Sequence, residues 1–299
     1  MKIEMLEFSS TKEIVEYAAS WNIALVGSGE DDRSKASIQY AGDHCDAVVT
    51  ISYDPDEMQI LAGDDIYQCY QIPELIKGLT AKQILLDATT LGVPELGLLL
   101  KHLYSNKKVK ASILYVEPGS YGQTDTNSGI NSREFNLSSE LKGYKGIPSL
   151  TDALDIETPN SVVFFLGFEG YRLQLALEEL NIIPHECSLV FGVPSFRSGW
   201  EMNAFDNNIK SINDNDLDGR VFYCGADNPA AVLYQLQSIR SSLGDDHKMT
   251  VVPIGSKPHS IGALCFCASD KKTSVLYDHP VKAKNRSGSV GSYHLYKIV

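Results

Sequence analysis

The chain has 299 residues, of which 43% are hydrophobic and 21% charged, so it is long enough to bury one large core or two smaller ones. Its 38 acidic and 26 basic residues give a formal charge of −12, which argues against non-specific binding of nucleic acid or of an anionic membrane by the surface as a whole. The first ten residues lack the pattern of a signal peptide, and no apolar run approaches a membrane span. We therefore expect a cytoplasmic protein of bacterial type without a membrane partner.

The first 120 residues alternate between helix-like and strand-like segments. Apolar and β-branched runs predict strands, whereas caps and prolines before helix-compatible spacings predict helices. The predicted strands span residues 23–26, 47–53, 84–87 and 111–116, with shorter ones at 58–61 and 68–70. The predicted helices span residues 10–20, 33–42, 73–77 and 94–103.

Residues 117–150 differ from what precedes them. They are rich in Gly, Ser, Asn and Thr and show no sustained periodicity, apart from a hairpin expected around residues 133–137. Connections of this length are usually functional loops or linkers. We therefore predict an N-terminal half at residues 1–120, a connection at 121–155 and a C-terminal half at 156–299.

The clearest pattern lies in residues 160–201. An apolar run from Val162 to Leu166 predicts a buried strand, and the leucines after Arg172 have a helix-compatible spacing. Further strands are predicted at residues 189–191, 221–224, 249–254 and 274–277, helices at 229–243 and 260–268, and an antiparallel edge strand at 293–298. This alternation predicts an α/β protein with two βαβ halves and mostly parallel sheets.

The repeated strand–turn–helix units resemble the broad group of Rossmann-like bacterial proteins, some of which sense nucleotides. The resemblance concerns architecture and carries no diagnostic motif, so it implies no functional residue. Glu30 and Arg33 recur at the same spacing as Glu169 and Arg172, each pair at the start of a predicted helix. This recurrence raises the hypothesis of an internal duplication with a cleft between the halves, although E-x-x-R also arises by chance.

Loops after strands are where open α/β sheets bind ligands, and several of them hold unusual residues here. Residues 27–30 form a small turn, but Asp32 breaks the GxGxxG pattern of dinucleotide binding. Glu169 and Arg172 have two explanations. A glutamate in a first helical turn, paired with an arginine three residues on, can be purely structural, or the two can serve a site with Glu169 as a base.

Cations and aromatic residues follow the other strand ends. Arg197 beside Trp200 has the chemistry of a stacking and phosphate-pairing loop. Lys257 and His259 follow a strand through Gly-Ser and precede a helix, which suits contact with an oxyanion, although solvated surface polarity explains them as well. Lys282 and Arg286 belong to a basic stretch that is either an exposed loop or a phosphate-binding arm.

Evidence for catalysis is sparse. Glu117 ends a predicted strand and, with Glu169, is a candidate base. The six cysteines form no CxxC and are expected to be reduced core thiols, while the histidines show no ligand spacing, so no metal site is predicted. No cofactor is identified.

Three hypotheses remain open. The first is a binding or sensory protein for a phosphorylated small molecule, above all a nucleotide, in a cleft between the halves. The second is a hydrolase or transferase acting on such a ligand. The third is an adaptor for a protein partner, for which the acidic surface suits a basic one.

Overall fold

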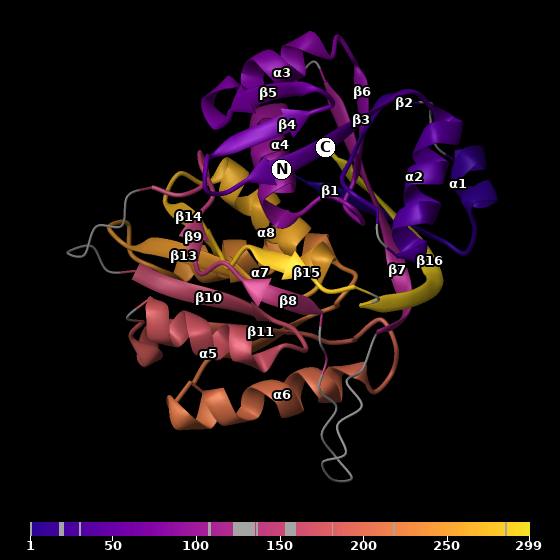
Figure 1. Cartoon of the computed structure of the whole chain (residues 1–299). Coiled ribbons are helices and arrows are strands. Elements are labelled where there is room, and N and C mark those ends of the chain that lie inside the picture. Colours follow the sequence, from indigo (N-terminus) through magenta and orange to yellow (C-terminus); the bar gives the residue numbers. More distant parts are fainter. Residues whose placement is uncertain are drawn as a thin grey trace. The chain divides into compact units, whose positions relative to one another are not determined.

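The computed structural model describes residues 2–17, 21–29, 31–106, 109–121, 135, 137–152, 160–180, 182–217, 219–284 and 286–299. The chain divides into two compact units: unit 1 is Met1–Ser120 with Ser287–Val299, and unit 2 is Tyr121–Arg286. Each unit is built of strands and helices around its own main sheet, as the α/β prediction requires (Figure 1).

The main sheet of unit 1 has eight strands. From edge to edge they are β1 (Ile3–Phe8), β16 (Ser287–Ile298), β7 (Lys110–Tyr121), β6 (Gln83–Asp87), β2 (Trp21–Val26), β3 (Cys45–Asp54), β4 (Gln59–Ala62) and β5 (Asp65–Gln68). The central strands β7, β6, β2 and β3 are parallel. Antiparallel pairs join β1 to β16, β3 to β4 and β4 to β5, so this sheet is mixed rather than mostly parallel.

The C-terminal strand differs from its prediction in extent and place. β16 begins at Ser287, pairs with β1 over Tyr293–Ile298 and lies between β1 and β7, so it is not an edge strand. Its residues Leu295 and Tyr296 are fully buried. Residues 287–299, which the sequence placed in the C-terminal half, therefore belong to unit 1.

The helices of unit 1 begin at recognisable caps. They are α1 (Thr11–Tyr17), α2 (Asp32–His44), α3 (Ile72–Gly78) and α4 (Val93–Ser105), with a 3-10 turn at Cys69–Gln71. Asp31 caps α2 by accepting a hydrogen bond from the Ser34 amide at 2.9 Å. On one face of the sheet Tyr40 and Ala41 of α2 pack against Ala24. Since side chains alternate along a strand, Leu25 is buried on the opposite face.

The main sheet of unit 2 follows a doubly wound order. Its strands are β12 (Val221–Cys224), β11 (Cys187–Gly192), β10 (Asn160–Leu166), β13 (Lys248–Pro253), β14 (Thr273–Tyr277) and β9 (Lys145–Gly146). All are parallel except β9, which is antiparallel to β14. The chain starts in the middle at β10, moves outward to β12 and returns to β13. The strand order therefore reverses between β10 and β13, which makes this the topological switch point.

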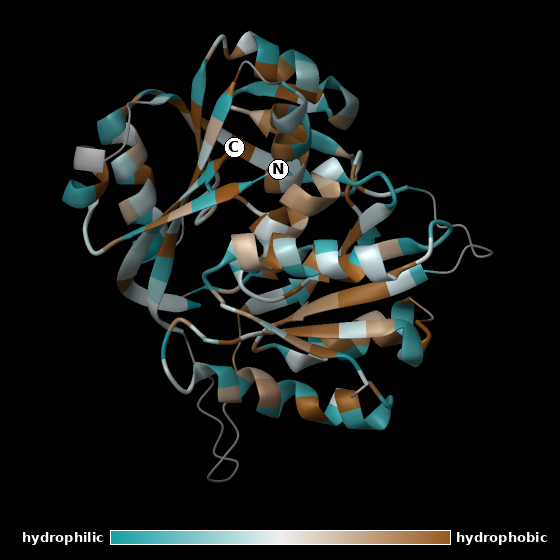
Figure 2. Cartoon of the chain, turned by 180° about the vertical axis from the view of Figure 1, so that it is seen from behind, coloured by the Kyte–Doolittle hydropathy of each residue, from teal (hydrophilic) through white to brown (hydrophobic). Residues whose placement is uncertain are grey.

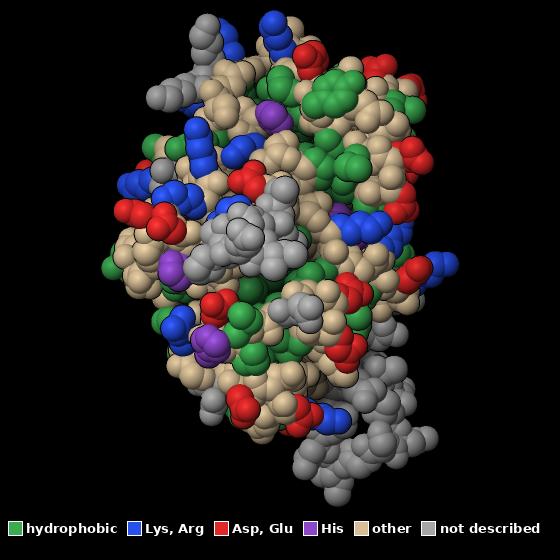
Figure 3. All heavy atoms as spheres, turned by 90° about the vertical axis from the view of Figure 1, so that its left-hand side faces the viewer, with side chains coloured by type: hydrophobic (Ala, Val, Ile, Leu, Met, Phe, Trp, Pro, Cys, Tyr) green, Lys and Arg blue, Asp and Glu red, His purple; other side chains and the backbone are tan. Residues whose placement is uncertain are grey.

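Four helices cover that sheet: α5 (Gly170–Glu179), α6 (Trp200–Asp214), α7 (Pro229–Ser242) and α8 (Lys257–Ser269), with a 3-10 turn at Pro184–Glu186. The strands are largely hydrophobic, whereas the helices carry both kinds of residue (Figure 2). Many Lys, Arg, Asp and Glu side chains are visible on the face shown in Figure 3. The α8 helix is an exception to this mixture, because residues 258–268 are all buried, as expected for a helix that is apolar all round.

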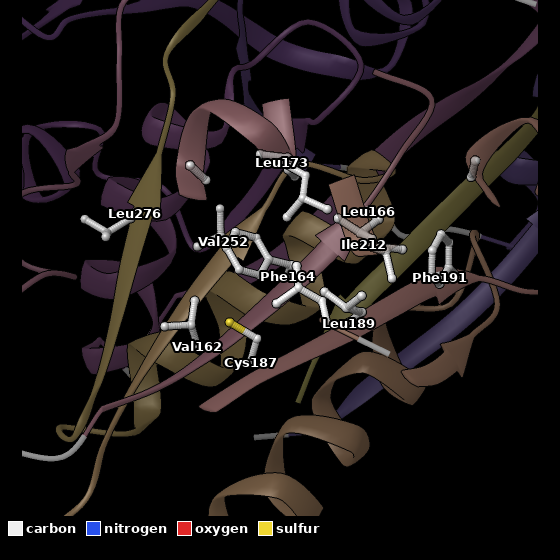
Figure 4. Close-up of a cluster of buried hydrophobic side chains, with 14 residues drawn as sticks. Val162, Phe164, Leu166, Leu173, Cys187, Leu189, Phe191, Ile212, Val252 and Leu276 are labelled. Atoms are coloured by element: carbon white, nitrogen blue, oxygen red, sulfur yellow. The ribbon is translucent and has the colours of Figure 1, made fainter. Parts of the chain in front are cut away.

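One cluster of buried side chains joins α5 and α6 to the sheet of unit 2. Phe164 of β10, Leu189 of β11 and Leu173 of α5 have at most 2% of their surface exposed and point toward one another (Figure 4). Burial of each such side chain contributes about 1.5–3 kcal/mol. All six cysteines of the chain are free thiols.

The predicted connection and the predicted basic loop both contain strands. The connection at 121–155 contains β8 (Ser138–Leu141) and β9, and β8 pairs with β15 (Pro280–Lys282), which was predicted to be a loop. Most of the hairpin expected around residues 133–137 lies outside the described residues. Glu30 also lies outside the described residues, so the internal duplication remains a hypothesis.

No helix in the described ranges is both long and apolar enough to cross a lipid bilayer.

Candidate ligand-binding site

The carboxyl edge of the unit 2 sheet holds a cavity of about 90 Å³. Its lining comes from the loops after β10, β11, β12 and β13 and from the first turns of α5, α6 and α8, together with Tyr121 and Leu137, and every lining residue lies within Tyr121–Arg286. The cavity thus lies at the switch point between β10 and β13, where open α/β sheets bind ligands. At roughly 10–15 Å³ per water, it has room for several waters, and hence for one group of a ligand rather than a whole dinucleotide.

Two glycines allow the loops at this switch point to approach closely. A Cβ atom on Gly167 would lie 2.9 Å from the Ile254 carbonyl oxygen, and one on Gly255 would lie 2.9 Å from the Leu166 carbonyl oxygen. Both contacts are too short for a real Cβ, so any other residue would force the ends of β10 and β13 apart.

Aromatic rings form much of the apolar lining. Tyr121 lies 5.4 Å from Phe168 and 5.1 Å from Trp200 between ring centroids, and Phe135 stacks on Phe168 at 4.6 Å. The Arg197 guanidinium lies 5.5 Å from the centre of the Trp200 ring. Trp200 and Arg197 are therefore together as predicted, whereas Tyr121 and Phe168 were not among the predicted site residues.

The α6 helix holds the β10 loop in place through two asparagines. The Asn207 side chain donates to the Phe168 carbonyl at 2.7 Å, and the Asn208 side chain donates to the Gly167 carbonyl at 2.8 Å. A Cβ on Gly170 would lie 1.8 Å from the Asn207 carbonyl oxygen, so α5 and α6 meet almost backbone to backbone. The sequence prediction missed α6 altogether, because adjacent asparagines are poor helix formers.

Glu169 and Arg172 line the cavity, but their charged groups are already engaged. Glu169 accepts hydrogen bonds from the amides of Leu137 and Ser138 at 2.9 and 2.8 Å, from the Ser138 hydroxyl at 2.9 Å and from the Tyr171 hydroxyl at 3.0 Å. The Glu169 carboxylate therefore links the β8 segment to the start of α5, and its oxygens already accept hydrogen bonds from the protein.

Arg172 forms a two-pronged ion pair with Asp278. Its Nε and one terminal nitrogen each lie 2.6 Å from an Asp278 oxygen, and the other donates to the Ile254 carbonyl at 3.2 Å. Burial opposes the charged form of Arg172, but the Asp278 charge outweighs it and raises the arginine's pKa. This guanidinium supports the β13 and β14 ends, as in the structural interpretation of the sequence.

A hydrogen-bonded turn opens α6 beside the cavity. The Ser195 hydroxyl bonds to the Glu201 carboxylate, and the Gly199 amide donates to the same carboxylate at 3.0 Å. The Ser195 hydrogen bond lowers the pKa of Glu201. Neither residue was predicted, and both serve to order the loop between β11 and α6.

His259 lines the cavity and has one ring nitrogen without a hydrogen-bond partner in the described part of the chain. Its Nε2 lies 3.2 and 3.0 Å from the carbonyl oxygens of Cys224 and Gly225 and so carries the hydrogen, which leaves Nδ1 as an acceptor. Nδ1 has no hydrogen-bond partner within the described residues. Burial lowers the pKa of His259 to about 4, so the ring is neutral at pH 7. Ser256 caps α8 by accepting from the His259 amide.

The remaining predicted residues lie elsewhere. Lys257 is half-buried at the first position of α8, next to the lining residue Ser256, and is not itself part of the lining. Lys282 of β15 faces Ser138 of β8, and Arg286 follows that ribbon; neither lines the cavity. Glu117 belongs to unit 1, where it lies 3.4 Å from His294.

The corresponding strand ends in unit 1 are closed by hydrogen bonds. Thr90 accepts from the Gly27 amide at 2.8 Å and donates to the Asp87 carboxylate at 2.6 Å, while Thr89 accepts from the Val116 amide at 3.0 Å. These bonds tie β2, β6 and β7 together. Burial raises the pKa of Asp87, which is fully enclosed. Asp87 and Thr90 therefore fill the switch point between β2 and β6.

The unit 2 site has apolar walls, three helix N-termini and few free polar atoms, a composition that suits binding. No protein-family model matches this chain, and no curated protein matches it.

Proposed function

We propose that unit 2 binds a small molecule that combines a planar ring with a phosphate or similar oxyanion, and that this ligand is a nucleotide. The observation that carries the proposal is the cavity at the β10–β13 switch point, between aromatic rings and helix N-termini. We expect the planar ring of the ligand to stack against the Trp200 indole, which the Arg197 guanidinium also contacts.

The oxyanion belongs at the start of α8. Gly255 and Ser256 line the cavity there, and Lys257 opens the helix. A helix N-terminus stabilises an anion by about 0.3–1 kcal/mol and presents amide groups to it. The two carboxylates of the site, Glu169 and Glu201, come instead from the starts of α5 and α6.

A binding or sensory role is favoured over turnover. The oxygens of Glu169 accept four hydrogen bonds, and Glu117 lies in unit 1, so neither candidate base is an unengaged group of this cavity.

Tryptophan fluorescence tests the proposal directly, because the chain has only two tryptophans. Trp200 lines the cavity, while Trp21 is buried in unit 1. In the variant Trp21→Phe, titration with nucleoside mono-, di- and triphosphates should quench the remaining Trp200 emission saturably. The matched variant Trp200→Phe should show no such change.

Two comparisons make the test specific. Nucleosides without phosphate should bind about tenfold more weakly than their phosphates, and Lys257→Ala should reduce that difference. The proposal fails if no phosphorylated compound changes the Trp200 signal at millimolar concentration, or if nucleosides and nucleotides bind equally.

A further inference from the structure

The outer strands of the unit 1 sheet leave one face uncovered. Ser52 of β3, Leu61 of β4 and Ile66 of β5 lie directly opposite one another across the strands, and all three are exposed. Thr50 and Val48 continue the same face along β3, since side chains alternate, and are exposed as well. We call these five residues the open face.

The other side of the same strands is packed. Ile51 is 1% exposed and Ile60 is fully buried. Apolar residues are expected on that packed side, but not on a side that faces water. On the open face Ile66 is 62% exposed, Val48 41% and Leu61 38%. Three apolar side chains on one exposed sheet face mark a candidate interaction surface.

The charge of this region is one-sided. Residues 36–76, which contain β3, β4 and β5, include no Lys or Arg. Their acidic residues are Asp43, Asp46, Asp54, Asp56, Glu57, Asp64, Asp65 and Glu74. All of these are exposed except Asp54, which is half-buried. In Figure 3, green hydrophobic side chains gather on the upper part of the visible face beside red carboxylates.

The β5 strand also offers a free edge. It is the last strand of the sheet and pairs only with β4. The Gln68 amide donates to the Gln71 side chain at 2.9 Å, whereas no described strand pairs with the outer backbone groups of Ile66. A second copy of this chain is a poor occupant, because residues 36–76 of each copy offer no Lys or Arg to pair with the carboxylates of the other.

We propose that the open face and the β5 edge bind an extended, basic segment of a partner protein, in which apolar residues alternate with lysine or arginine. The segment adds a strand to β5, lays its apolar side chains against Ile66 and Leu61, and pairs its cations with the surrounding carboxylates. This surface belongs to unit 1 and is independent of the cavity in unit 2.

A short fluorescent peptide of alternating lysine and valine serves as the probe, with fluorescence anisotropy on the full chain as the readout. We expect saturable binding that weakens as salt rises. A peptide of the same composition in scrambled order should bind about tenfold more weakly, since alternation is what matches the sheet. Equal binding of the two peptides would overturn the proposal in favour of plain charge attraction.

Three variants separate the contributions. Ile66→Asp removes the apolar contact and adds one negative charge, so the expected weakening of about tenfold cannot come from weaker charge attraction. The double variant Asp64→Asn/Asp65→Asn should weaken it mainly at low salt. Tyr234→Asp, at an exposed position on α7 of unit 2, is the matched control and should change nothing.

Sedimentation of the chain alone completes the test. A monomer in both wild type and Ile66→Asp agrees with the proposal. A wild-type dimer that Ile66→Asp converts to monomer would show that a second copy occupies the face and would overturn it. Unchanged peptide binding by Ile66→Asp would do the same.

Discussion

Asn208 is a polar residue whose place inside a helix has a clear reason. It is 1% exposed, and its amide donates to the carbonyl oxygens of Gly167 and Ala204 at 2.8 and 2.7 Å. An alanine at this position would favour the helix by up to about 0.7 kcal/mol but would leave the Gly167 carbonyl without this donor. The loop that forms the cavity thus depends on a side chain from the next helix.

We therefore expect Asn208→Ala to lower the free energy of unfolding by about 1–2 kcal/mol, because the cost of an unmet buried hydrogen bond exceeds the gain in helix propensity. Urea denaturation measures this. Asn213→Ala, at an exposed position of the same helix, is the control and should be neutral or slightly stabilising. If the two variants behave alike, the Asn208 bonds do not stabilise the fold.

His259 makes stability depend on pH in a defined window. Its pKa is about 4 in the folded chain and about 6.5 when unfolded, since burial disfavours the charged ring. Between these values the unfolded state binds a proton that the folded state does not. Stability is therefore retained above pH 6.5 and falls as the pH drops toward 4, by up to about 1.4 kcal/mol per pH unit.

His279 has the same lowered pKa of about 4 and adds to the slope, so the variant His259→Gln isolates one residue. Unfolding free energies from urea curves at pH 7, 6 and 5 should fall less steeply in this variant than in wild type. Equal slopes would mean that His259 is already protonated in the folded chain near pH 6.

At the scale of elements, the contact of α5 with α6 depends on the absence of a side chain. A Cβ at Gly170 would overlap the Asn207 carbonyl oxygen. We expect Gly170→Ala to destabilise the protein by about 1–3 kcal/mol, because the two helices must move apart. Gly42→Ala, within α2 and with open space around its Cβ, should instead stabilise by about 0.5–1 kcal/mol.

Thermal or urea unfolding measures the change in stability of both variants, Gly170→Ala and Gly42→Ala. Opposite signs are expected, since both changes improve helix propensity and only one of them creates a clash. A stable Gly170→Ala protein would show that α6 can shift freely, and the cavity between α5 and α6 would then be less fixed than the structure indicates.

At the scale of the whole molecule, the chain returns to unit 1 at its C-terminal end. β16 contributes the buried side chains of Leu295 and Tyr296 to a sheet otherwise made by residues 3–121. Deletion of residues 287–299 should therefore unfold unit 1 while unit 2 keeps its fold, since its own sheet and core are complete within Tyr121–Arg286.

The fluorescence of Trp21 reports on the folding of unit 1, and that of Trp200 reports on unit 2. In the truncated chain we expect Trp21 emission to shift to the red, as for an exposed indole, and Trp200 emission to stay as in the full chain; single-tryptophan variants assign the signals. Loss of both native signals would mean that unit 2 needs unit 1 in order to fold.

The sequence by itself determined the α/β class and most of the parallel strands. Runs such as Val162–Leu166 are apolar throughout because such strands are covered on both faces, and prolines such as Pro229 begin helices. The sequence also indicated that a ligand would bind at the loops after strands. Four predicted residues line one cavity there: Glu169, Arg172, Trp200 and His259.

Only the tertiary structure decided what those residues do. Whether Arg172 is available to a ligand depends on Asp278, which lies far along the chain, and no local pattern encodes that ion pair. The α6 helix forms despite poor propensity because Asn207 and Asn208 bind the β10 loop. Local pattern reports which side of a segment is buried, whereas long-range hydrogen bonds and charges decide which polar groups remain free.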